Sequence, residues 1–183
     1  MTPEEYVQLK AFARQDGALL SLFGIGGLFC YVQGLTNPVM ATLALLLIVA
    51  SPFFAANRLR HFRDDAREGI ISFKRGYAYT VLVFFYAGLL LAAAFYVYFA
   101  FIDNGYLLGK FGEMLHSDEG SRALKLYGLK EQVEQALREL ALMRPIDYAL
   151  NMLTMQITTG FLLGLPIAGL MQRKAVKSQN SKS

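Results

Sequence analysis

Three carboxylates between the second and third apolar runs have a spacing suited to diphosphate chemistry. Asp64, Asp65 and Glu68 are spaced like the aspartate-rich segments that hold magnesium-bound diphosphates, although the third residue is Glu. Such sites use a second acidic cluster on a facing helix, and the sequence offers none. His61 and Asp65 lie four residues apart, but a metal site needs three or four ligands. We therefore predict no catalytic residue, no metal and no cofactor; an enzyme would have these three carboxylates as its centre.

The same segment carries six basic side chains that are candidates for binding lipid phosphate or a partner. Guanidinium groups fork onto phosphate more specifically than lysines do, and polyprenyl phosphate and other anionic lipids offer such groups. The ordinary role of this charge is to fix orientation in a membrane, which is the interpretation we favour. Arg60 and Asp64 also have the spacing of a helical ion pair. The six candidates are Arg58, Arg60, Arg63, Arg67, Lys74 and Arg75.

The last apolar run has small residues at four-residue spacing, namely Gly160, Gly164 and Ala168. Inside a membrane, a face of small side chains lets another helix backbone approach closely, and polar side chains seek hydrogen bonds on a neighbouring helix. We predict that this run packs against other helices of the chain, of a homo-oligomer or of other membrane proteins. A polar substrate path is the alternative. The polar candidates are Asn151, Gln156 and Thr159.

These candidates belong to a chain whose composition suits a lipid solvent. Of 183 residues, 55% are hydrophobic and only 17% are charged. The apolar residues gather in runs of about 18–35, 39–56, 77–102 and 148–171, each long enough to span hydrocarbon. The runs contain no charged residue, which argues against an ion-coupled pump. We predict an all-α polytopic membrane protein of one domain, with four transmembrane helices in two antiparallel pairs.

The distribution of positive charge predicts the orientation. Twelve of the 18 Lys and Arg side chains lie before the first run, between the second and third runs, or after the last run. Because positively charged loops stay in the cytoplasm, both termini are expected there. Residues 172–183 form a basic tail without apolar periodicity, which we expect to be mobile. The net charge of +4 accompanies membrane runs, so it indicates topology and no nucleic-acid partner.

The long segment between the third and fourth runs has an apolar stripe at three-to-four-residue spacing, which predicts one external amphipathic helix over about 121–144. Gly128 is a weak point in this helix, and Pro145 is expected to end it. The helix lies either on the lipid surface or against protein. Asp103 and Asp147 flank the segment and are expected to be solvated carboxylates at helix ends. The stripe consists of Leu126, Leu129, Val133, Leu137, Leu140 and Met143.

Aromatic residues make up 13% of the chain, and several tyrosines lie near the two ends of the third run. Aromatic side chains with a polar tip favour the boundary between lipid and water. We therefore predict that these tyrosines form an interfacial belt. They are Tyr77, Tyr79, Tyr96, Tyr98 and Tyr106.

The segment from Arg63 to Gly76 has a distinctive order of residues: a helix end of mixed charge, Gly69, Ile-Ser-Phe ending at Phe73, and then Gly76 at the mouth of a span. With the aromatic run that follows, it resembles the domain-of-unknown-function family numbered 4199. The resemblance implies a small bacterial inner-membrane protein with four spans, a long loop between the last two and a basic tail. It implies no established activity and carries over no catalytic residue. It also implies genes near those of lipid-linked glycosyltransferases.

These observations favour a non-catalytic accessory or scaffold subunit of a bacterial inner-membrane assembly, with a lipid-linked glycosyltransferase as a candidate partner. The expected partners are the lipid bilayer, other membrane-protein chains or a second copy, and an anionic or polyprenyl-phosphate lipid. The alternative is a small transporter or flippase for a lipid-linked substrate. That function requires a polar cavity between the spans, near Gln156 and Thr159.

Overall fold

The computed structural model describes residues 2–173, and four helices within that range are long and apolar enough to cross a membrane. They are α1 (Pro3–Gly34), α2 (Pro38–Ala66), α3 (Phe73–Val97) and α7 (Pro145–Met171). The π-helical turn η1 (Tyr98–Ile102) extends α3. The predicted all-α polytopic membrane fold is confirmed. Of the predicted mobile tail, residues 174–183 lie outside the described residues.

Each spanning helix, with η1 counted as the continuation of α3, is longer than the apolar run that predicted it. An apolar run marks only the part of a helix that suits hydrocarbon, whereas the helix itself continues until a capping signal. In α1 that signal is a capping box: the Thr2 hydroxyl accepts from the Glu5 backbone N–H, and the Glu5 carboxylate accepts from the Thr2 N–H. In α2 the Asn37 side chain accepts from the Val39 N–H, and Pro38 begins the helix.

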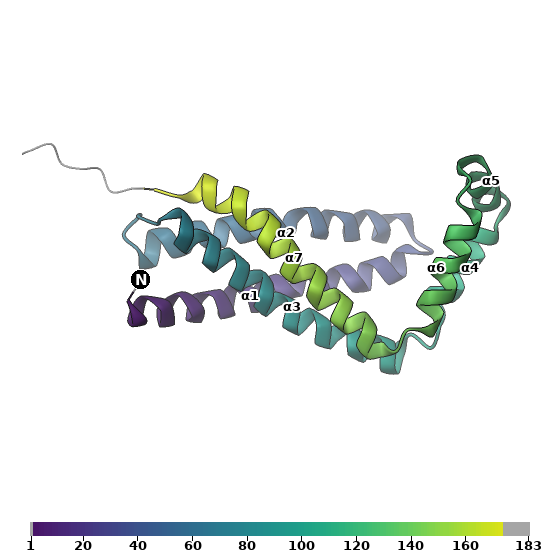
Figure 1. Ribbon diagram of the computed structural model, residues 1–183, viewed down its shortest axis with the longest axis horizontal. Helices are drawn as coiled ribbons and strands as arrows, with labels where there is room; N and C mark the ends of the chain where they lie inside the picture. The colour runs from purple at the N-terminus through teal and green to yellow at the C-terminus, as the bar shows by residue number, and fades with distance from the viewer. Residues whose placement is uncertain (1, 174–183) are drawn as a thin grey trace, which may run out of the picture.

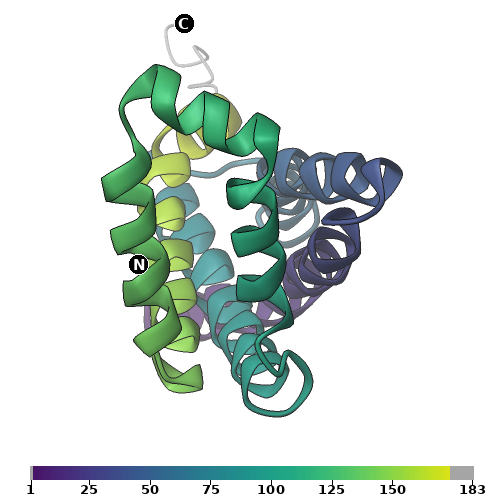
Figure 2. The same ribbon diagram turned by 90° about the vertical axis from the view of Figure 1, so that its right-hand side faces the viewer.

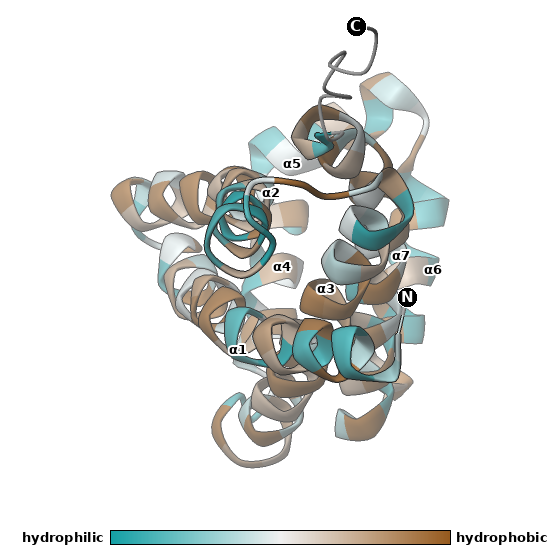
Figure 3. Cartoon of the chain, turned by 90° about the vertical axis from the view of Figure 1, so that its left-hand side faces the viewer, coloured by the Kyte–Doolittle hydropathy of each residue, from teal (hydrophilic) through white to brown (hydrophobic). Residues whose placement is uncertain are grey.

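The spanning helices form two antiparallel pairs, α1 with α2 and α3 with α7 (Figure 1). The α3–α7 contact is the most extensive, and α1 joins the pairs by packing against α3 as well as α2. One end of the bundle holds the start of α1, residues 67–72 and the end of α7, and we call it the basic end. Hydrophilic residues gather there on α1 and α2 (Figure 3). The opposite end, which we call the loop end, holds the turn at residues 35–37.

The four spanning helices pack closely near the basic end and less closely toward the loop end. Most of its fully buried apolar side chains come from the parts of α1, α2 and α3 near the basic end, such as Leu9, Leu59, Phe62 and Val83. The α2 and α7 helices come close toward the basic end and diverge toward the loop end (Figures 1 and 2). The two helix pairs therefore separate in the half of the bundle nearer the loop end.

The segment between α3 and α7 contains three helices, so the prediction of one helix over 121–144 is wrong. They are α4 (Tyr106–His116), α5 (Asp118–Tyr127) and α6 (Lys130–Leu142), and together they lie across the loop end (Figure 2). Gly128 adopts a left-handed conformation, with φ of +65°, and ends α5. Pro145 is the first residue of α7. The apolar stripe continues through the break because α5 and α6 are both amphipathic.

Asp103 is buried, at 6% exposed, so the expectation of a solvated carboxylate is wrong. One carboxylate oxygen accepts from the Tyr98 hydroxyl at 2.8 Å and the Leu107 N–H at 3.1 Å; the other accepts from the Gly105 N–H. The carboxylate thereby satisfies two N–H groups at the start of α4. Asp147 lies in the first turn of α7, where it forms an exposed pair with Arg144.

Candidate functional site: a polar network at the basic end

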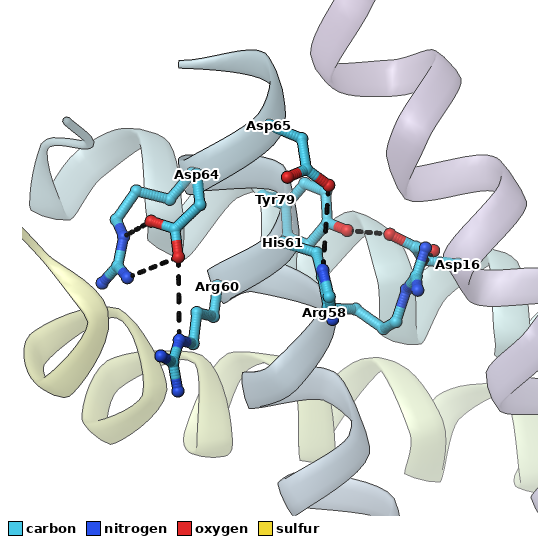
Figure 4. Close-up of polar contacts among 8 residues, drawn as sticks. Asp16, Arg58, Arg60, His61, Asp64, Asp65 and Tyr79 are labelled. Carbon is cyan, nitrogen blue, oxygen red and sulfur yellow. Dashed lines mark hydrogen bonds and ion pairs between the residues drawn. The ribbon is translucent and has the colours of Figure 1, made fainter. Parts of the chain in front are cut away.

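Asp16, Arg58 and Tyr79 meet between three helices near the basic end (Figure 4). The Arg58 Nε donates to Asp16 Oδ1 at 2.6 Å, and the Tyr79 hydroxyl donates to Asp16 Oδ2. Asp16 is 1% exposed and Tyr79 is fully buried, so the carboxylate is isolated from solvent. Removing one partner from a buried ion pair costs about 3–5 kcal/mol, because the other charge is left without compensation. This cluster therefore fixes α1, α2 and α3 together.

The sequence reasoning missed Asp16, and it placed Tyr79 in an interfacial belt. Asp16 precedes the first apolar run, so a search for charges within the runs passes over it. A signal for its burial exists: Leu9, Ala13, Asp16 and Leu20 recur at three-to-four-residue spacing, and all four are buried. Tyr79 stacks on Phe62, with ring centroids 4.8 Å apart, which places it in the core instead of at the lipid boundary.

Arg63 connects the end of α2 to the end of α7. Its side chain is 4% exposed, and its Nε and Nη2 donate to the two carboxylate oxygens of Asp64 at 2.7 and 3.0 Å. Its Nη1 donates to the Met171 carbonyl, the last in α7, at 3.1 Å. The Asp64 carboxylate also lies 3.6 Å from Arg60 Nε, so the predicted Arg60–Asp64 pair forms. The guanidinium of Arg63 therefore satisfies a helix-end carbonyl that lacks an intrahelical partner.

Glu5 connects the start of α1 to the segment between α2 and α3 and to the first turn of α3. Its two carboxylate oxygens accept from Arg67 Nη2 at 2.8 Å and from Arg75 Nη2 at 2.6 Å. In the same segment, Ile71 and Arg173 exchange both backbone hydrogen bonds, at 3.0 and 3.1 Å. These contacts join the two ends of the described chain to the α2–α3 connection.

Four of the six basic candidates thus form ion pairs that hold the helices in place or brace a helix end: Arg58, Arg63, Arg67 and Arg75. Arg60 is exposed and has only the longer contact with Asp64, and Lys74 is exposed. A cleft of about 500 Å³ beside residues 66–72 is lined in part by Arg67 and Arg75. The surface available to a phosphate is therefore smaller than the sequence suggested.

The three acidic candidates for diphosphate chemistry do not share one site. Asp64 faces Arg60 and Arg63, whereas Asp65 lies on another side of α2, 3.7 Å from His61 (Figure 4). Glu68 lies past the end of α2 in a left-handed conformation, with φ of +51°. Within residues 2–173, no group of three or more His, Cys, Asp or Glu side chains is placed to share a metal ion.

The small residues of α7 face α3 within the same chain. A Cβ built at Gly160 would lie 2.7 Å from the Phe84 Cβ, and one at Gly164 would lie 3.0 Å from the Tyr77 ring. Ala168 is 1% exposed and packs beside Gly76. This stripe therefore makes the α3–α7 pair.

The polar candidates of α7 have different environments. Asn151 is exposed, whereas Gln156 is half-buried and packs on Gly88 of α3. The Thr159 hydroxyl donates to the Met155 carbonyl of its own helix. Within the described residues, the Gln156 amide makes no hydrogen bond to another group of the chain.

A cavity of about 460 Å³ lies between all four spanning helices and includes Gln156 and Thr159 in its wall. The other lining residues are apolar except Ser51 and Tyr31, and none is charged. The Ser51 hydroxyl donates to the Leu47 carbonyl. A cavity therefore exists at the place where the transporter alternative requires one, but its wall is mostly apolar, whereas that alternative requires a polar cavity.

Comparison with known proteins gives one match. A family model described as "Protein of unknown function (DUF4199)" matches residues 15–173, which includes all four spanning helices in whole or in part. No curated protein and no solved structure matches the chain.

Proposed function

This chain belongs to the DUF4199 family of proteins of unknown function, and we propose from its own geometry that it is a non-catalytic accessory or scaffold subunit of a bacterial inner-membrane assembly. In this arrangement the basic end faces the cytoplasm, because it holds the excess of Lys and Arg near span ends. A lipid-linked glycosyltransferase is the candidate partner.

The observation that carries this proposal is the interlocked basic end. Asp16 joins α1 to α2 and α3, and Arg63 joins α2 to the last carbonyl of α7. A transporter that alternates between two states needs helices that move against one another at both ends of the site. Breaking buried ion pairs at each cycle would be costly, whereas a scaffold benefits from helices held in one arrangement.

The surface best placed to receive a partner is α2. Only 11% of its most apolar window is buried inside the chain, the smallest share among the four spanning helices within the described range. Its outward face is continuous and apolar, with Leu45, Leu46, Val49 and Phe53 all exposed. At the basic end, Arg60 and Lys74 add exposed positive charge for lipid headgroups or a cytoplasmic enzyme.

Purification of the full chain in mild detergent, followed by mass spectrometry of bound proteins, tests the proposal. The expected result is that one membrane protein copurifies with the tagged chain in a fixed ratio. In the reverse experiment, that membrane protein, when it carries the tag, should capture this chain. Leu45→Ala, Leu46→Ala and Val49→Ala together should release it, because they remove the packing surface of α2.

The matched control is Leu162→Ala, Leu165→Ala and Leu170→Ala together, which truncates three exposed apolar side chains of α7. It should leave the partner bound. A chain that purifies alone from membranes where it is made at its natural level, or a partner lost equally from both sets of variants, contradicts the proposal.

A second function, a small transporter or flippase for a lipid-linked substrate, is favoured by the cavity at Gln156 and Thr159. The absence of charge in its wall suits the hydrocarbon part of such a substrate better than its headgroup. Vesicles containing the purified chain, with a fluorescent lipid in one leaflet, test this function. It requires faster exchange between leaflets than in protein-free vesicles.

A further inference from the structure

The cavity between the four spanning helices lies at the depth of the hydrocarbon. Its wall is built from residues 20–31 of α1, 48–52 of α2, 84–95 of α3 and 152–163 of α7, all of which fall inside the apolar runs. The packed core closes it on the side of the basic end. Toward the loop end α2 and α7 diverge (Figure 1), and the cavity is not fully enclosed by the residues that line it.

A buried glycine marks the empty space. Gly27 is buried in the fold, yet a Cβ built on it would meet no atom within 4 Å. Interiors are normally packed without voids larger than a water molecule, so a space of about 460 Å³ is large. Pockets that take small ligands have volumes of about 300–1,000 Å³.

We propose that this cavity is a binding site for the hydrocarbon chain of a membrane lipid. The acyl chains of lipids fill the bilayer at this depth, and the cavity wall offers them apolar contact from all four helices. A charged headgroup is excluded because the wall holds no charge to pair with it. A partner helix of several turns does not fit. A single helical turn, about 10 Å across and 5.4 Å long, occupies about 400 Å³ and would already take up most of the 460 Å³ cavity.

This proposal deepens the second proposed function, because it names the part of a lipid that the cavity binds. Only the biological purpose of the binding rests on that function: the cavity can bind an acyl chain whether or not the protein transports lipid. A transport assay that fails while chain binding succeeds removes the flippase and leaves the site.

The chain contains no tryptophan, so one introduced tryptophan gives an unmixed fluorescence signal. Phe23→Trp places the probe in the cavity wall, and Phe53→Trp places it on the outward face of α2. The two positions have matched depth, because the Phe23 ring lies 4.8 Å from the ring of Phe54. The quencher is phosphatidylcholine brominated on its acyl chains, in nanodiscs.

The expected result is that brominated chains quench both probes by a similar factor. Gly27→Leu occupies the part of the cavity that lies one helical turn from residue 23, so it should clearly lower the quenching of the Phe23→Trp probe and leave that of Phe53→Trp unchanged. The Phe53→Trp signal also reports whether the filled variant is still inserted.

Two outcomes overturn the proposal. A Phe23→Trp probe that brominated chains do not quench, beside a quenched Phe53→Trp probe, shows that the cavity is closed to lipid. Quenching of Phe23→Trp by aqueous acrylamide shows that water fills it.

A measurement on the unaltered chain covers the case in which the filled variant fails to fold. Phosphatidylcholine with a diazirine in its acyl chain should attach to the cavity residues Leu28 and Met152 as well as to the outward Leu162. Attachment at Leu162 alone overturns the proposal.

Discussion

The carboxylate of Asp16 and the guanidinium of Arg58 form a 2.6 Å ion pair between antiparallel neighbouring helices, 42 residues apart in sequence. The carboxylate is 1% exposed and the guanidinium side chain is 28% exposed. The pair lies just outside the apolar runs, where α1 leaves the hydrocarbon. The pair therefore fixes the register of α1 against α2 at the point where the two helices leave the lipid.

Arg58→Ala is expected to lower the free energy of unfolding by about 3–5 kcal/mol, because it leaves the buried Asp16 carboxylate without its charge partner. Asp16→Ala is expected to cost less, because the Arg58 side chain is 28% exposed and can reach water. The double variant Asp16→Leu, Arg58→Met should recover much of this loss, since it removes both charges together. Reversible unfolding in mixed micelles, followed by circular dichroism, measures all three.

The control for this prediction is the exposed pair of Lys110 and Glu113 in α4. The Glu113 carboxylate raises the pKa of Lys110 by accepting its hydrogen bond, but both groups lie at the surface. Glu113→Gln should leave stability unchanged, because exposed pairs contribute little. Single variants at Asp16 or Arg58 that are as stable as the original chain would show that the buried pair does not hold the fold.

The four spanning helices could be predicted from sequence because length and apolarity alone determine what crosses a bilayer. The Arg60–Asp64 pair within α2 could be predicted from its spacing, but the contacts of the polar network between helices could not, because they join residues distant in sequence. Asp16 and Arg58 come together only after α1 and α2 pack, and Arg63 reaches the Met171 carbonyl across 108 residues. The hydropathy of each run says nothing about the rotation of one helix against the next.

Gly160→Leu is expected to destabilise the protein by about 1–3 kcal/mol, as overpacking of a close helix contact does. The Cβ that it adds would lie 2.7 Å from the Phe84 Cβ, which cannot rotate away. Gly169→Leu is the matched control in the same helix, since a Cβ there meets nothing within 4 Å. Thermal unfolding compares the two, and equal melting temperatures would contradict the close α3–α7 contact.

Gln156→Leu is expected to raise the free energy of unfolding, by as much as about 1–3 kcal/mol. The amide has no hydrogen-bond partner within the described residues and faces an apolar cavity, so replacing it relieves an unsatisfied polar group. The same unfolding measurement applies. A loss of stability of similar size would show that the amide bonds to a lipid or to another chain.

The segment between α3 and α7 was predicted less well than the spans, for a local reason. Its apolar stripe has the same spacing on both sides of Gly128, so periodicity alone reads α5 and α6 as one helix. The left-handed conformation at Gly128 depends on backbone freedom that the stripe does not report. The burial of Asp103 escaped prediction because two of its three hydrogen-bond donors are backbone N–H groups, which sequence does not distinguish.

The orientation predicted from positive charge can be measured with single cysteines, because Cys30 is the one cysteine in the chain and is buried. In a Cys30→Ala background, Lys74→Cys lies in the first turn of α3, at the basic end, and Lys125→Cys lies in α5; both positions are exposed. The excess of positive charge near span ends predicts that the basic end, with residue 74, lies in the cytoplasm. A membrane-impermeant maleimide added to intact cells whose outer membrane is permeable should therefore label residue 125 and spare residue 74.

Opening the inner membrane should make residue 74 reactive, which shows that its thiol is accessible. Labelling of residue 74 before that step would reverse the orientation and place Arg60 and Lys74 out of reach of any cytoplasmic partner.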